Sequence, residues 1–252
     1  MKILKIIDLS RFFGGVKALQ NMTTDIEENS ITALIGPNGA GKTTAFNLIT
    51  GILPLTSGKV IFCGKDITGK PPHKIAYTGI SRTFQNVRIF SNMTVLENVM
   101  MGLHTRTKSG ILSSALKLRR TKKEESYIRD EAAKCLEFME LGWAIDMNAG
   151  SLAFGQQRIL EIARALAMKP KLLLLDEPAA GLNSQETLKL GETINKIQKT
   201  GVTVFIVEHD MELVMSISHS IVVLNNGRLI ASGTPSEIQR DQEVITAYLG
   251  EE

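Results

Sequence analysis

One segment restricts the possible folds of this chain more than any other: Gly36-Pro37-Asn38-Gly39-Ala40-Gly41-Lys42-Thr43. It matches the pattern G-x-x-x-x-G-K-[ST], and it lies between an apolar run at 31–35 and a helical pattern that ends near residue 51. Glycines in such a loop let backbone N–H groups turn inward around an anion, and the following helix points its positive end at the same place. The alternative is a glycine-rich turn that matches by chance, which the order of strand, loop and helix disfavours. We therefore predict a phosphate-binding loop.

The loop also supplies side chains for a nucleoside triphosphate and its metal ion. We expect Lys42 to reach the β- and γ-phosphates and Thr43 to ligate Mg²⁺, with the hydroxyl of Thr44 nearby. The predicted ligands are thus ATP and Mg²⁺. The residues expected to contact the nucleotide here are Gly36, Pro37, Asn38, Gly39, Ala40, Gly41, Lys42, Thr43 and Thr44.

A second motif places two carboxylates, Asp176 and Glu177, directly after the apolar run 172–175. The carboxyl ends of strands line the ligand crevice in sheets of this kind. We expect Asp176 to hold Mg²⁺ through water and Glu177 to position or deprotonate the attacking water. The pair alone could be a solvated strand end, but its place after a phosphate loop favours catalysis.

Hydrophobic periodicity predicts an α/β fold. Residues in the first thirty alternate with period two, as at Met22, Thr24 and Ile26, which predicts strands. After residue 150, strands at 172–175 and 202–207 alternate with helices at 156–168 and from about 183 to 201, which predicts a parallel sheet covered by helices. Asn183 or Ser184 is the expected cap of the second helix. The middle, 86–150, lacks strand-like runs, and its spacing predicts a helix over 124–141.

Composition excludes several classes of protein. The chain has 252 residues, 43% of them apolar, and a net charge of +3, too weak to indicate a nucleic-acid partner. No apolar run approaches the length of a membrane-spanning helix, and the first residues do not resemble a signal peptide, so we expect a cytoplasmic chain. Cys63 and Cys135 form no metal or redox motif, and we expect two reduced thiols.

Further motifs surround these two in a fixed order. They are Phe13 before Gly14, Thr83-Phe84-Gln85, Leu152-Ala153-Phe154-Gly155-Gln156-Gln157, Ala180-Gly181-Leu182-Asn183 and Glu208-His209-Asp210. They resemble the adenine-stacking aromatic, the Q-loop, the LSGGQ signature, the D-loop and the switch histidine of ABC ATPases. The resemblance extends from residue 13 to 209 and covers nearly the whole chain.

This resemblance implies a P-loop NTPase fold of the ABC type. It has a mostly parallel core sheet with helices, an N-terminal antiparallel β part and a helical subdomain. The implied single domain spans 1–252, with about 1–85 and 155–252 as nucleotide-binding core and about 86–154 as the permease-facing helical part. ABC ATPases work as head-to-tail dimers, so Ala153, Gly155 and Gln156 would contact the partner's ATP. His209 would contact the γ-phosphate, and Gln85 would ligate Mg²⁺ and take part in catalysis.

A closer resemblance is to ATPases of branched-chain amino-acid importers. It rests on Ser81-Arg82-Thr83-Phe84-Gln85-Asn86-Val87-Arg88-Ile89-Phe90, on Glu208-His209-Asp210-Met211 and on Ala247-Tyr248-Leu249-Gly250-Glu251. It implies two permease subunits, a second and non-identical ATPase subunit, an extracytoplasmic binding protein, and a peripheral place on the cytoplasmic face of the plasma membrane. ATPases for urea, short amides and lipopolysaccharide export share parts of the pattern.

The sequence leaves two alternative functions and the role of one basic segment to be considered. A non-transport ABC ATPase of DNA maintenance or translation usually has a coiled-coil insertion or tandem ATPase domains, which the printed chain lacks. Lys42, Asp176, Glu177 and His209 disfavour a sensor that does not hydrolyse ATP. A basic run is interpreted as a solvated surface, with acidic lipid or a permease loop as the alternative contact. It consists of Lys117, Arg119, Arg120, Lys122 and Lys123.

Three positions depart from the family pattern. Ala153 replaces the signature serine, Phe154 replaces its first glycine, and Asn183 replaces an aspartate of the D-loop. Gly155 and the helix that follows still offer N–H donors to a phosphate. We therefore expect the composite site to persist in weakened form, and we hypothesise that the two ATP sites of the dimer are unequal.

Overall fold

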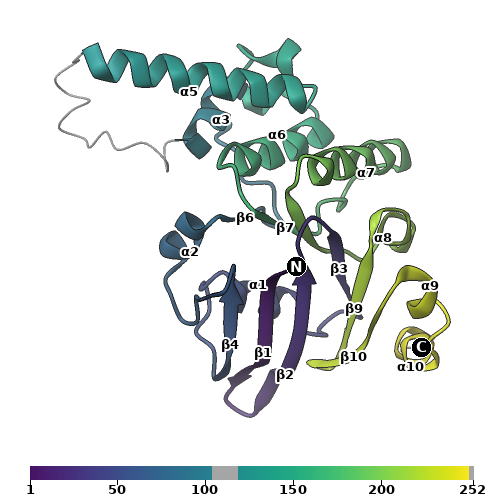
Figure 1. Ribbon diagram of the computed structural model, residues 1–252. Helices are drawn as coiled ribbons and strands as arrows, with labels where there is room; N and C mark the ends of the chain where they lie inside the picture. Colours follow the sequence, from purple (N-terminus) through teal and green to yellow (C-terminus); the bar gives the residue numbers. More distant parts are fainter. Residues whose placement is uncertain (104–118, 250–252) are drawn as a thin grey trace. The chain divides into compact units, whose positions relative to one another are not determined.

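The computed structural model describes residues 1–103 and 119–249 (Figure 1). The chain forms two compact units: unit 1 comprises Met1–Arg82 and Lys171–Glu252, and unit 2 comprises Thr83–Pro170. The family resemblance implies a nucleotide-binding core of about 1–85 and 155–252, and the compact units place Gln85 and residues 155–170 with the helical part instead. The reason is tertiary packing, because the helix α6, Phe154–Ala167, packs against the other helices of unit 2.

A six-stranded sheet forms the centre of unit 1, in the order β10-β9-β3-β8-β7-β6. Five neighbouring strands run parallel, and β10 alone pairs antiparallel with β9. Every residue of β3, β7 and β8 is buried, as expected for parallel strands covered on both faces. The strands are β3 (Ile31–Ile35), β6 (Ile80–Arg82), β7 (Leu172–Asp176), β8 (Thr203–Val207), β9 (Ser220–Asn225) and β10 (Arg228–Gly233).

A smaller antiparallel sheet of unit 1 has the order β2-β1-β4-β5, which confirms the predicted N-terminal β part. Its inward residues and alternate residues of the large sheet belong to one apolar cluster around helix α1, Lys42–Ile49. The ring of Phe46 on α1 lies 5.1 Å from that of Phe205 on β8. The strands are β1 (Lys2–Phe13), β2 (Val16–Glu27), β4 (Ser57–Phe62) and β5 (Lys65–Asp66).

Of the remaining helices of unit 1, α7 follows β7, α8 follows β8, α9 and α10 follow β10, and α2 lies between β5 and β6. Asn183 caps α7, since its Oδ1 accepts from the Glu186 N–H at 3.0 Å while the Glu186 carboxylate accepts from the Asn183 N–H. This confirms one of the two predicted caps. The helices are α2 (Pro72–Thr78), α7 (Ser184–Lys199), α8 (Met211–Ile217), α9 (Pro235–Ile238) and α10 (Gln242–Leu249).

Unit 2 is helical, with α3 (Val95–Leu103), α5 (Arg119–Phe138) and α6 in mutual contact, and with short 3₁₀ turns η2 (Gly142–Ala144) and η3 (Ala149–Ser151). The predicted helix over 124–141 is present as α5, but both of its bounds were wrong. Glu140 takes a left-handed φ of 60°, and the Leu141 N–H returns to the Leu136 carbonyl at 2.8 Å, which ends the helix. Lys117 of the basic run lies outside the described residues. None of the described helices is long and apolar enough to span a membrane.

Candidate functional site

The phosphate loop joins β3 to α1 in the predicted order. The ammonium group of Lys42 is buried in the loop, with Nζ donating to the carbonyls of Gly36 at 2.5 Å and Pro37 at 2.9 Å. Asn38, at the turn of the loop, and Thr43, on the first turn of α1, are exposed. The loop thus places a lysine ammonium group beside the amino end of α1. Both carry positive charge, so this site favours an anion.

Glycine is required at the two ends of this loop. A Cβ at Gly36 would lie 2.0 Å from the Leu224 carbonyl oxygen, and one at Gly41 would lie 2.5 Å from that of Ala18. Both contacts are with backbone, which cannot turn away as a side chain could. The loop therefore packs without side chains at these positions, and its residues fit a polyphosphate held by main-chain N–H groups and Lys42.

The two predicted carboxylates lie at the carboxyl end of β7. Asp176 is the last residue of the strand, with its side chain 3% exposed. Glu177 is half-buried, and its backbone has a left-handed φ of 46° while its N–H donates to the Val207 carbonyl at 2.9 Å. Such a conformation costs a non-glycine residue on the order of 1–3 kcal/mol and concentrates at functional sites. The turn thus directs Glu177 away from the path of the strand.

The predicted metal ligands also fit the chemistry of magnesium. Among the residues that the structure describes, no three His, Cys, Asp or Glu side chains gather into a metal site. Magnesium does not need one, because it keeps several waters and is usually held by one or two protein carboxylates together with phosphate oxygens. The oxygen donors of Thr43 and Asp176 suit that coordination.

Arg82 contacts the candidate site, and no role for it was predicted from the sequence. Its guanidinium, at the end of β6, donates to Asp176 Oδ2 at 2.7 Å, to Asn47 Oδ1 at 2.8 Å and to Thr50 Oγ1 at 3.0 Å. The Arg82 side chain is only 6% exposed, and it also lies over the Phe46 ring. One buried cation therefore joins the predicted magnesium carboxylate to the helix that begins at the phosphate loop.

His209 and Phe13 are the exposed members of the candidate site in unit 1. His209 lies two residues beyond β8, and its side chain is 62% exposed. Phe13, the last residue of β1, is 43% exposed, and the Arg11 guanidinium lies 4.4 Å from the centre of its ring. Both side chains are thus accessible to a ligand, as their predicted roles require.

In unit 2, a buried ion pair holds the segment around Gln85. Arg158 of α6 is 1% exposed, and it donates to Glu161 Oε2 at 3.1 Å and to the carbonyls of Phe84 at 3.0 Å and Gln85 at 2.9 Å. Glu161 Oε1 accepts from the Arg88 N–H at 3.2 Å. Burial raises the pKa of the Glu161 carboxyl, and the Arg88 N–H and the Arg158 charge oppose that rise. The helix of the signature motif thereby fixes the backbone of Gln85, whose side chain is exposed.

The signature motif forms the amino end of α6. Ala153 is the cap residue, and its N–H donates to the side-chain oxygen of Gln156 at 3.0 Å. Only half of a capping box is formed, because the methyl group of Ala153 cannot accept from the Gln156 N–H. Ala153 and Phe154 are exposed and Gly155 is half-buried, so this helix end is accessible.

The comparisons with known proteins agree with this geometry. Residues 19–180 match the ABC transporter family model, and residues 228–252 match a model described as branched-chain amino acid ATP-binding cassette transporter. The chain is 46% identical over 250 residues to the high-affinity branched-chain amino acid transport ATP-binding protein BraF of Pseudomonas aeruginosa, spanning 99% of this chain and 98% of that protein. The chain belongs to the ATP-binding subunits of the ABC transporter family. LivG of Escherichia coli, which has the same description, is 43% identical over 250 residues, at 99% and 98% coverage.

Solved ABC structures share the fold of the whole chain. A nucleotide-free ATP-binding cassette from an ABC transporter aligns with a TM-score of 0.87 and 35% identity, covering 100% of both chains. A cassette described as a dimeric post-hydrolysis state bound to ADP and Pi aligns with a TM-score of 0.76 and 25% identity, covering 92% of this chain and 98% of that one. These neighbours confirm the predicted ABC ATPase fold.

Proposed function

We propose that this chain is the ATP-hydrolysing subunit of an importer for branched-chain amino acids. Two permease subunits would carry the solute, a second and non-identical ABC ATPase would complete the motor, and an extracytoplasmic binding protein would deliver the substrate. The chain would work on the cytoplasmic face of the plasma membrane, bound through the permease. The full-length identity to BraF and LivG supports the solute class.

The register of the parallel strands is the observation that best supports ATP hydrolysis. Asp176 of β7 pairs with Val207 of β8, and Val207 pairs with Leu34 of β3. The phosphate loop, Glu177 and His209 each begin one or two residues beyond these paired positions. Since the three strands are adjacent and parallel, their functional residues emerge at one edge of the sheet, where ligands of such folds bind.

Each residue has a distinct role in the proposed hydrolysis. Lys42 and the loop N–H groups hold the phosphates, and Phe13 stacks on the adenine. Thr43 and Asp176 would hold Mg²⁺, with Gln85 as the further ligand that the family resemblance implies, and the ion would supply charge neutralisation for the transferring phosphoryl group. Glu177 accepts the proton of the attacking water, and His209 donates a hydrogen bond to the γ-phosphate. Gln85 also reports the nucleotide state to the permease.

The amino end of α6 would serve the nucleotide bound to the partner ATPase. Ala153 offers no hydroxyl, so Gly155 and the helix N-terminus would supply the contact, and Gln156 would act partly through the cap. A weaker contact on this side makes the two ATP sites of the dimer unequal. Restoring serine at Ala153 should therefore raise ATP turnover in the complete transporter, and no gain would contradict unequal sites.

A transport assay tests the solute. The chain is assembled with its permease subunits and partner ATPase in proteoliposomes, with ATP on the ATPase side and the binding protein on the other. We expect uptake of leucine, isoleucine and valine that stops in the Glu177→Gln complex. Uptake of urea or a short amide instead would assign one of the alternative solutes, and hydrolysis without uptake of any of them would contradict the importer.

A further inference from the structure

A fully buried carboxylate lies between two loops of the candidate site. Glu208 follows the last residue of β8, precedes His209, and is 0% exposed. No role is yet assigned to it. Acidic side chains are almost never fully buried unless they are paired, so the contacts of Glu208 need an explanation.

Among the described residues, Glu208 accepts hydrogen bonds from the backbone of these two loops, and its Oε2 also lies 3.8 Å from His209 Nδ1. Oε1 accepts from the N–H of Ala179 at 2.7 Å, two residues after Glu177. Oε2 accepts from the N–H of His209 at 3.0 Å and, more weakly, from that of Asp210 at 3.4 Å. One carboxylate therefore joins the segment that follows the catalytic glutamate to the segment that holds the histidine.

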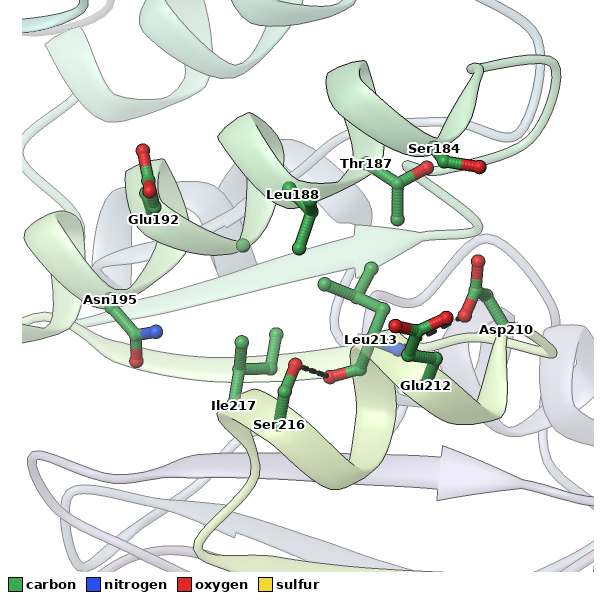
Figure 2. A pocket seen from close by; sticks show the side chains of 11 residues that line it. Ser184, Thr187, Leu188, Glu192, Asn195, Asp210, Glu212, Leu213, Ser216 and Ile217 are labelled. Carbon is green, nitrogen blue, oxygen red and sulfur yellow. Dashed lines mark hydrogen bonds between the residues drawn. The ribbon is translucent and has the colours of Figure 1, made fainter.

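The backbone around His209 is fixed on its other side as well. Asp210 caps α8, with its Oδ1 accepting from the Leu213 N–H at 3.0 Å (Figure 2). The Glu177 N–H bonds to the Val207 carbonyl, which is a second link between the loops after β7 and β8. Hydrogen bonds thus fix the backbone on both sides of the exposed His209 side chain. Glu208 connects this backbone to the loop that carries Glu177.

Burying the charged carboxylate of Glu208 costs free energy, which an apolar side chain at the same position would avoid. Burial raises the pKa of the Glu208 carboxyl, and the N–H groups of Ala179, His209 and Asp210 oppose that rise. A well-packed apolar side chain would avoid the desolvation of a charge. It could not, however, accept hydrogen bonds from both loops.

We propose that Glu208 is a positioning residue that aligns His209 with the loop carrying Glu177 by accepting hydrogen bonds from both segments. The inference rests on the proposed function, in which both residues act in ATP hydrolysis. Glutamine is the informative replacement, because it preserves the volume but keeps only one acceptor oxygen. Whichever way the amide is oriented, its NH₂ group faces a backbone N–H and one loop is released.

The test is a double-mutant cycle in the assembled transporter, using Glu208→Gln, His209→Ala and both together. We expect Glu208→Gln to lower kcat by about tenfold, with the affinity for a fluorescent ATP analogue within about twofold of wild type. In the His209→Ala background, the same change should lower kcat by no more than about twofold, because the residue through which Glu208 acts is gone. Glu212→Gln is the matched control, since this exposed glutamate on α8 lines the groove between α7 and α8 (Figure 2).

The outcomes separate this inference from the proposed function. Wild-type kcat in Glu208→Gln, or an equal loss in both backgrounds, would overturn the positioning role. Normal turnover in His209→Ala beside an inactive Glu177→Gln would also overturn it while leaving the ATPase intact. Absence of hydrolysis in the wild-type complex would overturn both. If Glu208→Gln fails to fold, Glu208→Asp takes its place in the cycle with the same expectations, because its shorter carboxylate can stay with His209 but withdraws from Ala179.

Discussion

Replacing Arg82 with methionine is expected to destabilise unit 1 strongly. The side chain is buried and donates to Asp176, Asn47 and Thr50. Methionine preserves much of the volume but leaves the Asp176 carboxylate without its cationic partner at 2.7 Å. The loss should therefore exceed that of an exposed ion pair, which is worth about 0–1 kcal/mol.

The magnitude follows from the burial of both partners. Removing one member of a buried ion pair costs about 3–5 kcal/mol, because the other charge stays desolvated. Since 1 kcal/mol shifts Tm by about 2–4 °C in domains of 150–250 residues, we expect Arg82→Met to lower Tm by about 6–20 °C.

Thermal unfolding followed by circular dichroism measures this effect in Arg82→Met, Asp176→Asn and the double variant. The double variant should be less destabilised than the sum of the single ones, by about 0.5–3 kcal/mol, because each single variant already removes the ion pair between Arg82 and Asp176. Arg228→Met, at an exposed arginine of β10, serves as the control and should change stability by less than about 0.5 kcal/mol. A Tm of Arg82→Met within about 2 °C of wild type, or strictly additive effects, would refute the reasoning.

Three further predictions concern single positions. Gly36→Ala places a Cβ 2.0 Å from the Leu224 carbonyl oxygen, so it should weaken ATP binding at least about tenfold, and unchanged affinity by fluorescence titration would contradict the loop geometry. Ala153→Ser supplies the acceptor missing for the Gln156 N–H, so it should stabilise the protein by about 0.5–2 kcal/mol in urea unfolding, with no gain as the contrary result. Burial raises the pKa of the Cys135 thiol to about 12 from its ordinary 9.0. The thiol therefore stays protonated at pH 8, and the rate of its alkylation in the folded protein should still be rising at about pH 10, whereas a plateau near pH 9 would contradict this.

The parts of the site that follow from local sequence were predicted from it. The phosphate loop needs glycines, a lysine and a hydroxyl within eight residues of one strand-to-helix turn, and all of these lie in one stretch. The pair Asp176 and Glu177 stands directly after an apolar strand. The cap of α7 likewise depends on Asn183 and Glu186, three residues apart.

The residues that support the site depend on contacts between distant parts of the chain. Arg82 is separated from Asp176 by 94 residues, Glu208 from Ala179 by 29, and Arg158 from the Gln85 carbonyl by 73. Periodicity identifies which positions are buried but does not identify the partner of a buried charge. All three charged residues lie inside or beside recognised motifs. The only sign of their structural role in the sequence was a charged residue next to an apolar strand or helix face. Short elements could not be predicted either. The three residues of β6 are too few to show the alternation of apolar and polar residues that identifies a strand.

The boundary between the two compact units could not be predicted from the sequence for a similar reason. The signature motif precedes a helix whose pattern fits either core. Packing of α6 against α3 and α5 decides the question, and these contacts join residues far apart in the chain.

The most direct test of the central claim is phosphate release from Mg·ATP by the assembled transporter, with wild-type chain compared with Glu177→Gln. A general base typically contributes 10²–10⁴-fold, so we expect the variant to bind ATP with wild-type affinity while its hydrolysis falls by at least about a hundredfold. Unhydrolysed ATP should then remain trapped in the complex. Equal rates of phosphate release in the two proteins would contradict the assignment of Glu177 and the hydrolytic site built around it.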